Sequence, residues 1–187
     1  FNTGSNVSNA LSLSTGNDKS QSYISVATTN ATGIMPNNDY DRYNFSFRNT
    51  TNFLNNKFIL DTSANYIIQN DKNMVSQGQY FNPLTSLYLF PRGEDFSDVA
   101  VYERYDDLSG VNTQYWPYGD LGGVSSQNPY WIMNRMNREN DRRRYKLAAS
   151  LQYNIIEGLN VQGRVSIDNT ESKYTEKFHA GTVGNFA

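Results

Sequence analysis

The sequence contains no cysteine and only one histidine, and these two scarcities narrow the functions open to it. Without cysteine the chain has no disulfide framework and no thiolate for a metal or redox centre. The lone His179 excludes a histidine-rich metal cluster, and nothing near it in the sequence suggests a catalytic triad. A formal net charge of −2 gives no indication of binding to a nucleic-acid backbone.

Long apolar runs are also absent, because hydrophobic residues make up 37% of the chain and the mean hydropathy is −0.68. No stretch approaches the roughly 20 apolar residues that a membrane helix needs. The opening residues, FNTGSNVSNA, lack the basic and apolar regions of a signal peptide. Aromatic residues nevertheless reach 14%. A polar average with many rings indicates that the apolar residues are arranged on faces instead of in runs.

Six segments alternate in the manner of strands and pair into hairpins at 7–32, 43–69 and 144–169. Their internal connections, GNDK, LNNK and IIEG, are short and rich in the residues that favour tight turns. Between the hairpins lie the loop GIMPNNDYD and a far longer loop at 70–141. Residues 1–187 therefore read as one all-β unit, an antiparallel up-and-down meander with short turns at one end and long loops at the other.

Alternate residues of the last four strands separate into an apolar and a polar face. Between Tyr43 and Phe53, for example, rings occupy one face and Arg48 occupies the other. The polar faces of these strands carry charged residues that we expect to face a lumen or a plug: Arg48, Asp61, Lys146 and Arg164. The pattern does not decide which face of the strand at 22–32 is apolar.

Two environments produce such alternation, a soluble β-sandwich and a transmembrane β-barrel. The expected strands are about 10 to 11 residues long, which matches membrane strands better than globular ones. Charged residues on a lipid-facing side would each cost up to roughly 2 to 4 kcal/mol, whereas a wet lumen accepts them. Rings end the apolar faces about 25 Å apart and form an expected aromatic girdle of Tyr43, Phe53, Tyr145 and Tyr153. The barrel is therefore favoured.

Several stretches, in this order, resemble the SusC/RagA-like TonB-dependent transporters of the Gram-negative outer membrane. SLSTGNDKSQSYISV and GIMPNNDYDRYNFSF are similar to an early barrel hairpin and its return strand. LYLFPRGEDFSDVAVYERYD, TQYW and NPYWIMNRMNRENDRRRY resemble the long extracellular loop and the strand after it. IIEGLNVQGRVSIDN is similar to the next turn and strand.

The resemblance implies an active importer, not an enzyme, built as a barrel of about 22 strands. A plug domain fills such a barrel, a SusD-like lipoprotein closes its outer mouth, and the TonB complex supplies the work through the plug. Substrates of the family are oligosaccharides or oligopeptides, and outer-membrane lipid and lipopolysaccharide surround the barrel. No plug, TonB box or closing strand is recognisable, so we expect an internal segment of a longer transporter.

Rings are concentrated in the long loop, which makes it the expected place of substrate contact, because ring faces stack on sugar C–H surfaces. The alternative is that a loop of this length folds on itself around a small core of its own. The candidate residues are Tyr80, Phe81, Tyr88, Phe90, Tyr115, Trp116, Tyr118, Tyr130 and Trp131. Within this loop Asn128 and Pro129 predict the start of a helix.

An acidic stretch in this loop and a basic cluster beside it can each be interpreted either as a binding site or as an ordinary solvated surface. The acidic stretch GEDFSDVAVYERYDD is a candidate short helix and Ca²⁺ site, although it lacks the spacing of a calcium loop. The basic cluster suits phosphates of lipopolysaccharide or an anionic substrate, or forms a solvated face that Glu139 and Asp141 partly neutralise. Its members are Arg135, Arg138, Arg142, Arg143 and Arg144.

Two alternatives to the importer stay open. One is a soluble β-sandwich that binds carbohydrate through the aromatic loop. The other is a glycoside hydrolase, which requires two placed carboxylates, and no pair in the sequence is marked by its context. Solubility without detergent separates both from a membrane segment.

Overall fold

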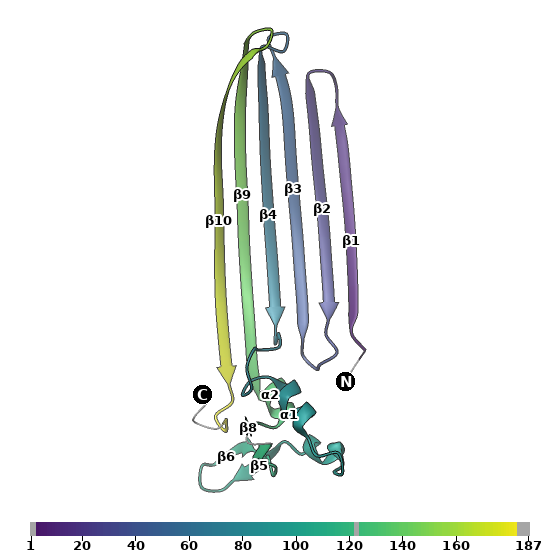
Figure 1. The fold of residues 1–187 in the computed structure, drawn as a ribbon, viewed down its shortest axis with the longest axis vertical. Helices are drawn as coiled ribbons and strands as arrows, with labels where there is room; N and C mark the ends of the chain where they lie inside the picture. The colour runs from purple at the N-terminus through teal and green to yellow at the C-terminus, as the bar shows by residue number, and fades with distance from the viewer. Residues whose placement is uncertain (1–2, 122–123, 183–187) are drawn as a thin grey trace.

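The computed structural model describes residues 3–121 and 124–182 of the chain. Its main body is a six-stranded antiparallel sheet whose strands lie side by side in the order β1-β2-β3-β4-β9-β10 (Figure 1). The strands are β1 (Ser5–Gly16), β2 (Ser20–Thr32), β3 (Asp39–Phe53), β4 (Phe58–Lys72), β9 (Met136–Ile156) and β10 (Leu159–Phe178). The prediction of an all-β antiparallel meander is therefore confirmed.

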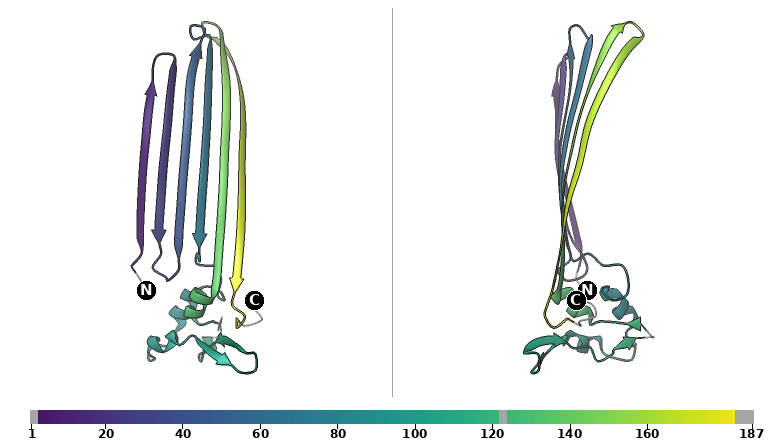
Figure 2. Two further views of the ribbon diagram at one scale, coloured as in Figure 1. Left: turned by 180° about the vertical axis from the view of Figure 1, so that it is seen from behind. Right: turned by 90° about the vertical axis from the view of Figure 1, so that its left-hand side faces the viewer.

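Seen from the side, the sheet is a single layer that bends and twists along its length (Figure 2). Right-handed twist is the ordinary property of long strands. The outer strands β1 and β10 each pair with one neighbour only. Each therefore leaves one edge of backbone N–H and C=O groups without a strand partner in the described part of the chain.

Short turns gather at one end of the sheet and the longer connections at the other, as the sequence predicts (Figure 1). The turn between β3 and β4 places Leu54, Asn55 and Asn56 at positive φ, where asparagine is tolerated better than most residues. The turn between β9 and β10 has Gly158 at φ 80°. Residues suited to left-handed backbone thus set where the strands reverse.

The strands are longer than the alternation of apolar residues indicates. The strands β9 and β10 have 21 and 20 residues, so the last hairpin extends well beyond the predicted 144–169. The long loop correspondingly narrows from the predicted 70–141 to 73–135. Apart from Met136, Tyr174 and Phe178, both faces of the added strand segments are polar, so their sequence carries little period-2 signal, although backbone pairing continues from Tyr145–Asn169 to Met136–Phe178.

The loop between β4 and β9 folds into a small body beyond the end of the sheet, called the lobe here (residues 73–135; Figure 1). It contains α1 (Pro83–Leu89), the 3₁₀ helix η1 (Phe96–Ala100), β5 (Glu103–Asp106), β6 (Val111–Gln114), β7 (Asp120–Leu121), β8 (Val124–Ser125) and α2 (Pro129–Arg135). The predicted start of α2 is confirmed, because Asn128 caps it by accepting from the Tyr130 N–H at 2.9 Å. Asn82 caps α1 in the same way, by accepting from the Leu84 N–H.

The apolar core of the described residues lies in the lobe and at the adjoining ends of β9 and β10, and not on the faces of the sheet. Trp131, Ile132 and Met136 are buried there, and Phe81, Tyr102 and Phe178 pack against them. The Trp131 indole N–H donates to the Thr182 hydroxyl at 3.2 Å, which ties the segment after β10 to the lobe. Among all the residues that the structure describes, no helix is both long and apolar enough to cross a membrane.

The two ends of the lobe are held together where β4 and β9 leave the sheet. The Asn73 N–H donates to the Arg138 carbonyl at 2.8 Å, and the Arg138 N–H donates to Asn73 Oδ1 at 2.8 Å. Asn38 in the shorter loop donates to the Asn73 carbonyl at 2.9 Å. These contacts fix the lobe at the end of the sheet.

Candidate functional site

Cross-strand register gathers the rings of one sheet face into two rows. Near the lobe, Phe45 pairs with Tyr66, and Tyr66 pairs with Tyr145. Near the short turns, a second row runs through Phe53, Phe58 and Tyr153, and the rings of Phe58 and Tyr153 stack with centroids 4.6 Å apart. Between the rows β3 advances about 26 Å at roughly 3.3 Å per residue.

These rows refine the predicted girdle of Tyr43, Phe53, Tyr145 and Tyr153. Phe53 and Tyr153 lie in the same row, and Tyr145 lies in the other. Tyr43 lies one position beyond that row, opposite Ile68. The residues that sequence reasoning missed are Phe45, Phe58 and Tyr66. Their signal is cross-strand pairing, which alternation within a single strand does not contain.

Register also settles the face of β2 that the sequence leaves open. Ile24 pairs with Phe47 and Val26 pairs with Phe45, so both lie on the ring-bearing face. Leu11 and Leu13 of β1 pair with Val26 and Ile24 and continue that face to the edge of the sheet. The apolar face therefore extends over all six strands.

Between the two aromatic rows this apolar face carries no charged side chain in the described residues. Aliphatic residues such as Leu147, Leu151 and Val165 occupy it, and all three are exposed. Beyond the row nearest the lobe, the same face becomes charged. Its residues there include Asp39, Asp41, Lys72, Glu139, Asp141, Arg143, Glu171, Lys173 and Lys177. The first charged residues beyond that row are Arg143 on β9 and Glu171 on β10, and Asp41 on β3 and Lys72 on β4 follow farther along the strands.

A small polar cluster interrupts the apolar band on β2 and β3. The Asn49 side chain donates to the Ser22 and Ser20 hydroxyls at 2.8 and 3.1 Å, and to the Gln21 carbonyl. The Thr51 hydroxyl donates back to Asn49 Oδ1 at 2.6 Å. Because these groups bond one another, they lower the cost of placing polar atoms on an apolar face.

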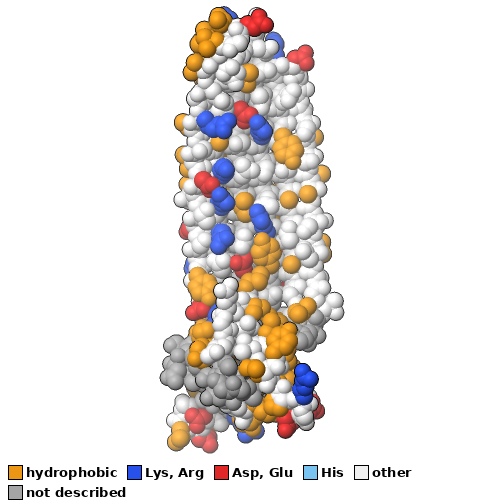
Figure 3. Space-filling view, viewed as in Figure 1, with side chains coloured by type: hydrophobic (Ala, Val, Ile, Leu, Met, Phe, Trp, Pro, Cys, Tyr) orange, Lys and Arg blue, Asp and Glu red, His pale blue; other side chains and the backbone are white. Residues whose placement is uncertain are grey.

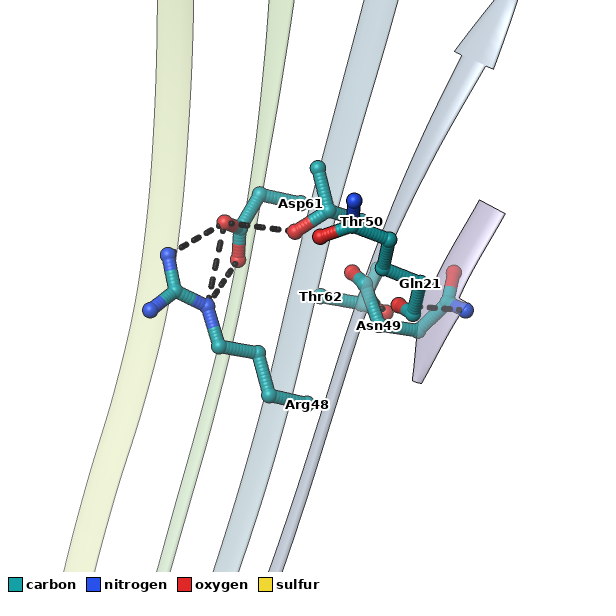
Figure 4. A network of polar contacts seen from close by, with 6 residues as sticks. All are labelled: Gln21, Arg48, Asn49, Thr50, Asp61 and Thr62. Carbon is teal, nitrogen blue, oxygen red and sulfur yellow. Dashed lines mark hydrogen bonds and ion pairs between the residues drawn. The ribbon is translucent and has the colours of Figure 1, made fainter. Parts of the chain in front are cut away.

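The opposite face of the sheet is polar and holds ion pairs. Arg48 Nη2 lies 2.6 Å from Asp61 Oδ2, and the Thr50 hydroxyl donates to the same carboxylate (Figure 4). Arg144 and Asp168 form a second pair at 2.6 Å. The predicted placement of Arg48 and Asp61 on one face agrees with this direct contact.

The polar face is also the hollowed one. Side chains from five strands line one open depression on it, from Tyr23 on β2 through Ser46, Asp61 and Ser150 to Arg164 on β10. Figure 3 shows that basic side chains gather along this face over β9, β10 and their neighbours, whereas apolar side chains form separate patches over the rest of the face and along its margins. The sheet therefore has one hollowed polar face and one exposed apolar face.

The rings of the lobe pack on one another, which supports the alternative that the loop folds around its own core. Trp131 is completely buried, so its prediction as a substrate-contact residue is wrong for this structure. Its ring meets that of Tyr102, and Phe81 packs against the same core. The remaining contacts join successive rings of Tyr102, Tyr130, Phe96, Phe90, Tyr118 and Trp116.

The other predicted contact residues differ in how much of each ring is accessible to solvent. The Tyr115 ring is covered by the Arg104 guanidinium at 3.3 Å, a close cation–π contact. The Trp116 indole N–H donates to the Gly119 carbonyl and to the Ser126 hydroxyl. Tyr88 is 82% exposed and Tyr80 is partly exposed, so these two remain the most accessible rings.

The basic cluster does not form one solvated face. Arg135 pairs with Glu103, Arg138 pairs with Glu176, and Arg144 pairs with Asp168. Arg138 is buried and lies over the rings of Phe81 and Phe178. Glu139 and Asp141, the predicted neutralising residues, take part in none of these ion pairs, because they occupy odd positions of β9 and therefore lie on the opposite face from Arg138 and Arg144.

The Arg135–Glu103 pair makes the stability of the lobe depend on pH. Arg135 Nε and Nη2 each donate to Glu103 at 2.8 Å, and these bonds lower the pKa of the Glu103 carboxyl. A lowered pKa stabilises the folded lobe above the unfolded value of about 4.3, and the contribution is lost as pH falls through the folded value. Both side chains are partly exposed, so solvent limits the contribution to about 1 kcal/mol.

We therefore expect Glu103→Gln to lower the urea midpoint of the lobe at neutral pH. The variant and the original protein should unfold alike once the pH is well below the lowered pKa of Glu103, because the carboxyl of the original protein is then protonated and as uncharged as the amide that replaces it. Fluorescence of Trp116 and Trp131, the only two tryptophans of the chain and both in the lobe, measures the transition. A difference that persists unchanged at the lower pH would exclude the ion pair as its cause.

Within the described residues, no three His, Cys, Asp or Glu side chains come together in a way that could hold a metal ion. The predicted acidic helix exists in part as η1, and Asp95 caps it by accepting from the Ser97 N–H. The lone histidine packs edge-on against Trp131, with ring centroids 5.7 Å apart.

The chain matches no model of a known protein family, and no curated protein is significantly similar to it.

Proposed function

We propose that the six-stranded sheet is part of the wall of a large transmembrane β-barrel in a bacterial outer membrane, and that this barrel is a TonB-dependent importer of the SusC/RagA type. The membrane placement rests on the two faces of the sheet. The choice of family rests on the sequence resemblance of the hairpins, the long loop and the strand after it. In this proposal the protein transports substrate and catalyses no reaction.

The observation that carries the proposal is an uncharged, exposed band between two aromatic rows. The band spans about 26 Å along the strands, and a strand tilt of about 40° projects this length to roughly 20 Å, within a few ångströms of the apolar band of about 25 Å between the aromatic girdles of outer-membrane barrels. On β9 and β10 charges begin immediately beyond the row nearest the lobe, at Arg143 and Glu171. At the same heights the opposite face carries Arg48, Asp61, Lys146 and Arg164, which a water-filled lumen accommodates at little cost.

The open edges of β1 and β10 fit the same assignment. Unpaired backbone groups are not tolerated in hydrocarbon, so each edge must pair with a further strand. Additional strands on both sides would continue the wall into a barrel of about 22 strands. A plug inside it, a SusD-like lipoprotein at its mouth and the TonB complex complete the proposed importer of oligosaccharides or oligopeptides.

The orientation follows from the loops. Outer-membrane barrels have short periplasmic turns and longer extracellular loops. The turns at 54–57 and 157–158 therefore lie on the periplasmic side, and the lobe lies outside the cell. Because β9 continues from Tyr145 to Met136 beyond the aromatic row, it places the lobe about 30 Å along the strand, or roughly 23 Å in height at a tilt of about 40°, beyond the boundary of the apolar band.

The runner-up, a soluble carbohydrate-binding sandwich, requires a second sheet over the apolar face. Within residues 3–121 and 124–182 the only other sheets are the two-stranded pairs β5-β6 and β7-β8 of the lobe. The rings of the lobe pack on one another instead of forming an open platform. Both features favour the importer.

Fractionation of cells that make the full-length protein tests the proposal. We expect the protein in the outer membrane, resistant to extraction by urea and released by detergent. Protease added to intact cells should cleave the lobe and leave the turn at 54–57 uncut. Recovery of the intact protein in the soluble fraction, or cleavage of that turn from outside, would refute the proposal.

A further inference from the structure

The polar face of the sheet carries more basic than acidic side chains. Alternation and register place on it the cations Arg42, Arg48, Arg138, Arg142, Arg144, Lys146 and Arg164. The carboxylates on the same face are Asp61, Asp71, Asp168 and Glu176. Any molecule in contact with this face therefore meets an excess of positive charge.

Because ion pairs neutralise some of these cations, the excess positive charge belongs to the cations that have no carboxylate partner. Asp61, Asp168 and Glu176 are each paired with one arginine of the sheet. Arg42 donates to Asn44, and Arg142 donates to the Ser172 hydroxyl, so their described hydrogen bonds go to neutral groups. Among the described residues, Lys146 and Arg164 form no ion pair within 4.0 Å.

Together with Arg144, which is paired with Asp168, these side chains form a track along the wall, called the cationic track here and consisting of Arg42, Arg142, Arg144, Lys146 and Arg164. Arg142, Arg144 and Lys146 occupy successive inward positions of β9, which lie about 7 Å apart. Arg42 lies at the height of Arg142, and Arg164 lies closer to the short turns, opposite Ser150. The track thus leads from the lobe end towards the turn end.

The surface beside the track offers hydroxyl and amide groups and few rings. Ser25, Ser46, Ser63, Asn65 and Ser150 line the depression that Arg164 borders. Such groups donate and accept hydrogen bonds, as sugar hydroxyls do. Pores that conduct anions place arginine and lysine along the path in the same manner.

We infer that the substrate of this wall is an anionic oligosaccharide, a sugar chain that carries carboxylate or sulfate groups, and that the cationic track guides it. The inference rests on the proposed function and names its substrate class. The guanidinium groups bind carboxylate or sulfate oxygens, and the neighbouring hydroxyls and amides bind the uncharged part of each sugar.

Binding of a labelled oligogalacturonate to the full-length protein in detergent tests this inference, with a neutral malto-oligosaccharide of equal length as the reference. We expect the charged chain to bind at least tenfold more tightly at low salt, and its advantage to shrink as ionic strength rises towards 0.5 M. The triple variant Arg142→Gln, Lys146→Gln, Arg164→Gln should lose that advantage and keep its affinity for the neutral chain.

A matched control removes the same charge from the other face. The variant Arg143→Gln, Lys173→Gln, Lys177→Gln should bind both chains like the original protein. Three results would overturn the inference: no preference for the charged chain, tighter binding of an oligoglutamate peptide of equal charge, or a triple variant that only lowers thermal stability because the track docks another part of the polypeptide. Fractionation of the same cells separates these results from failure of the importer proposal itself.

Discussion

Replacing Ala149 with arginine is expected to remove most of the protein from the outer membrane, whereas replacing Ala148 with arginine should leave it there. The two alanines are neighbours on β9, but they lie on opposite faces. Ala149 pairs with Thr62 and Val165 in the middle of the apolar band, and Ala148 pairs with Ser63 on the polar face. The starting residue, the new residue and the strand are the same in both variants.

The expected difference is about 2 to 4 kcal/mol, which is the cost of arginine on the lipid side at mid-bilayer. Such a cost corresponds to a roughly 30- to 1000-fold change in the equilibrium between inserted and unfolded protein. Urea titration of the full-length protein in lipid vesicles measures it, and the amount in the outer-membrane fraction reports it in cells. If both variants insert equally well, Ala149 does not face hydrocarbon and the importer proposal loses its main support.

Replacing Trp131 with alanine should unfold the lobe while the sheet stays intact. Trp131 is fully buried between Ile132, Met136 and the rings around them. Removing a buried tryptophan typically costs about 3 to 5 kcal/mol, a large share of the stability of so small a core. Limited proteolysis should then cleave within 73–135 at low protease concentration, and the fragments should remain in the membrane.

Tyr88→Ala provides the control, because Tyr88 is 82% exposed and its removal leaves no cavity. Its cleavage pattern should match that of the original protein. Measuring substrate uptake by cells separates a ring that contacts substrate from a ring that holds the fold of the lobe. Reduced uptake by Tyr88→Ala with an intact lobe would identify Tyr88 as a contact residue. Reduced uptake by Trp131→Ala follows from loss of the fold. A lobe that resists proteolysis without Trp131 would contradict the assigned core.

The meander itself could be predicted because its signals are local. Alternation within one strand, and residues such as Asn55, Asn56 and Gly158 at the turns, need no knowledge of distant neighbours. The register between hairpins depends on residues far apart in the sequence, because β4 and β9 are neighbours in the sheet but are separated by the long loop. The rows through Tyr66 and Phe58 depend on that register, so single-strand patterns predicted only part of the aromatic girdle.

In the lobe, too, features that depend on neighbouring residues could be predicted, and features that depend on distant contacts could not. The cap at Asn128 could be predicted because an asparagine before a proline favours a helix start through nearby atoms alone. The same pair at Asn82 and Pro83 carried an equal signal, which the prediction omitted. Burial of Trp131 could not be predicted, because the spacing of rings along the chain does not say which of them share a core. For the same reason the carboxylate partners of the arginines were misplaced.

The hydrogen bonds between Asn73 and Arg138 make the lobe an exchangeable part of the structure. They join the two ends of the lobe directly, so the alignment of β4 with β9 does not depend on how many residues lie between them. The entropic cost of closing a longer or shorter insert changes slowly with its length. A different insert can therefore replace the lobe while the six strands of the sheet keep their register.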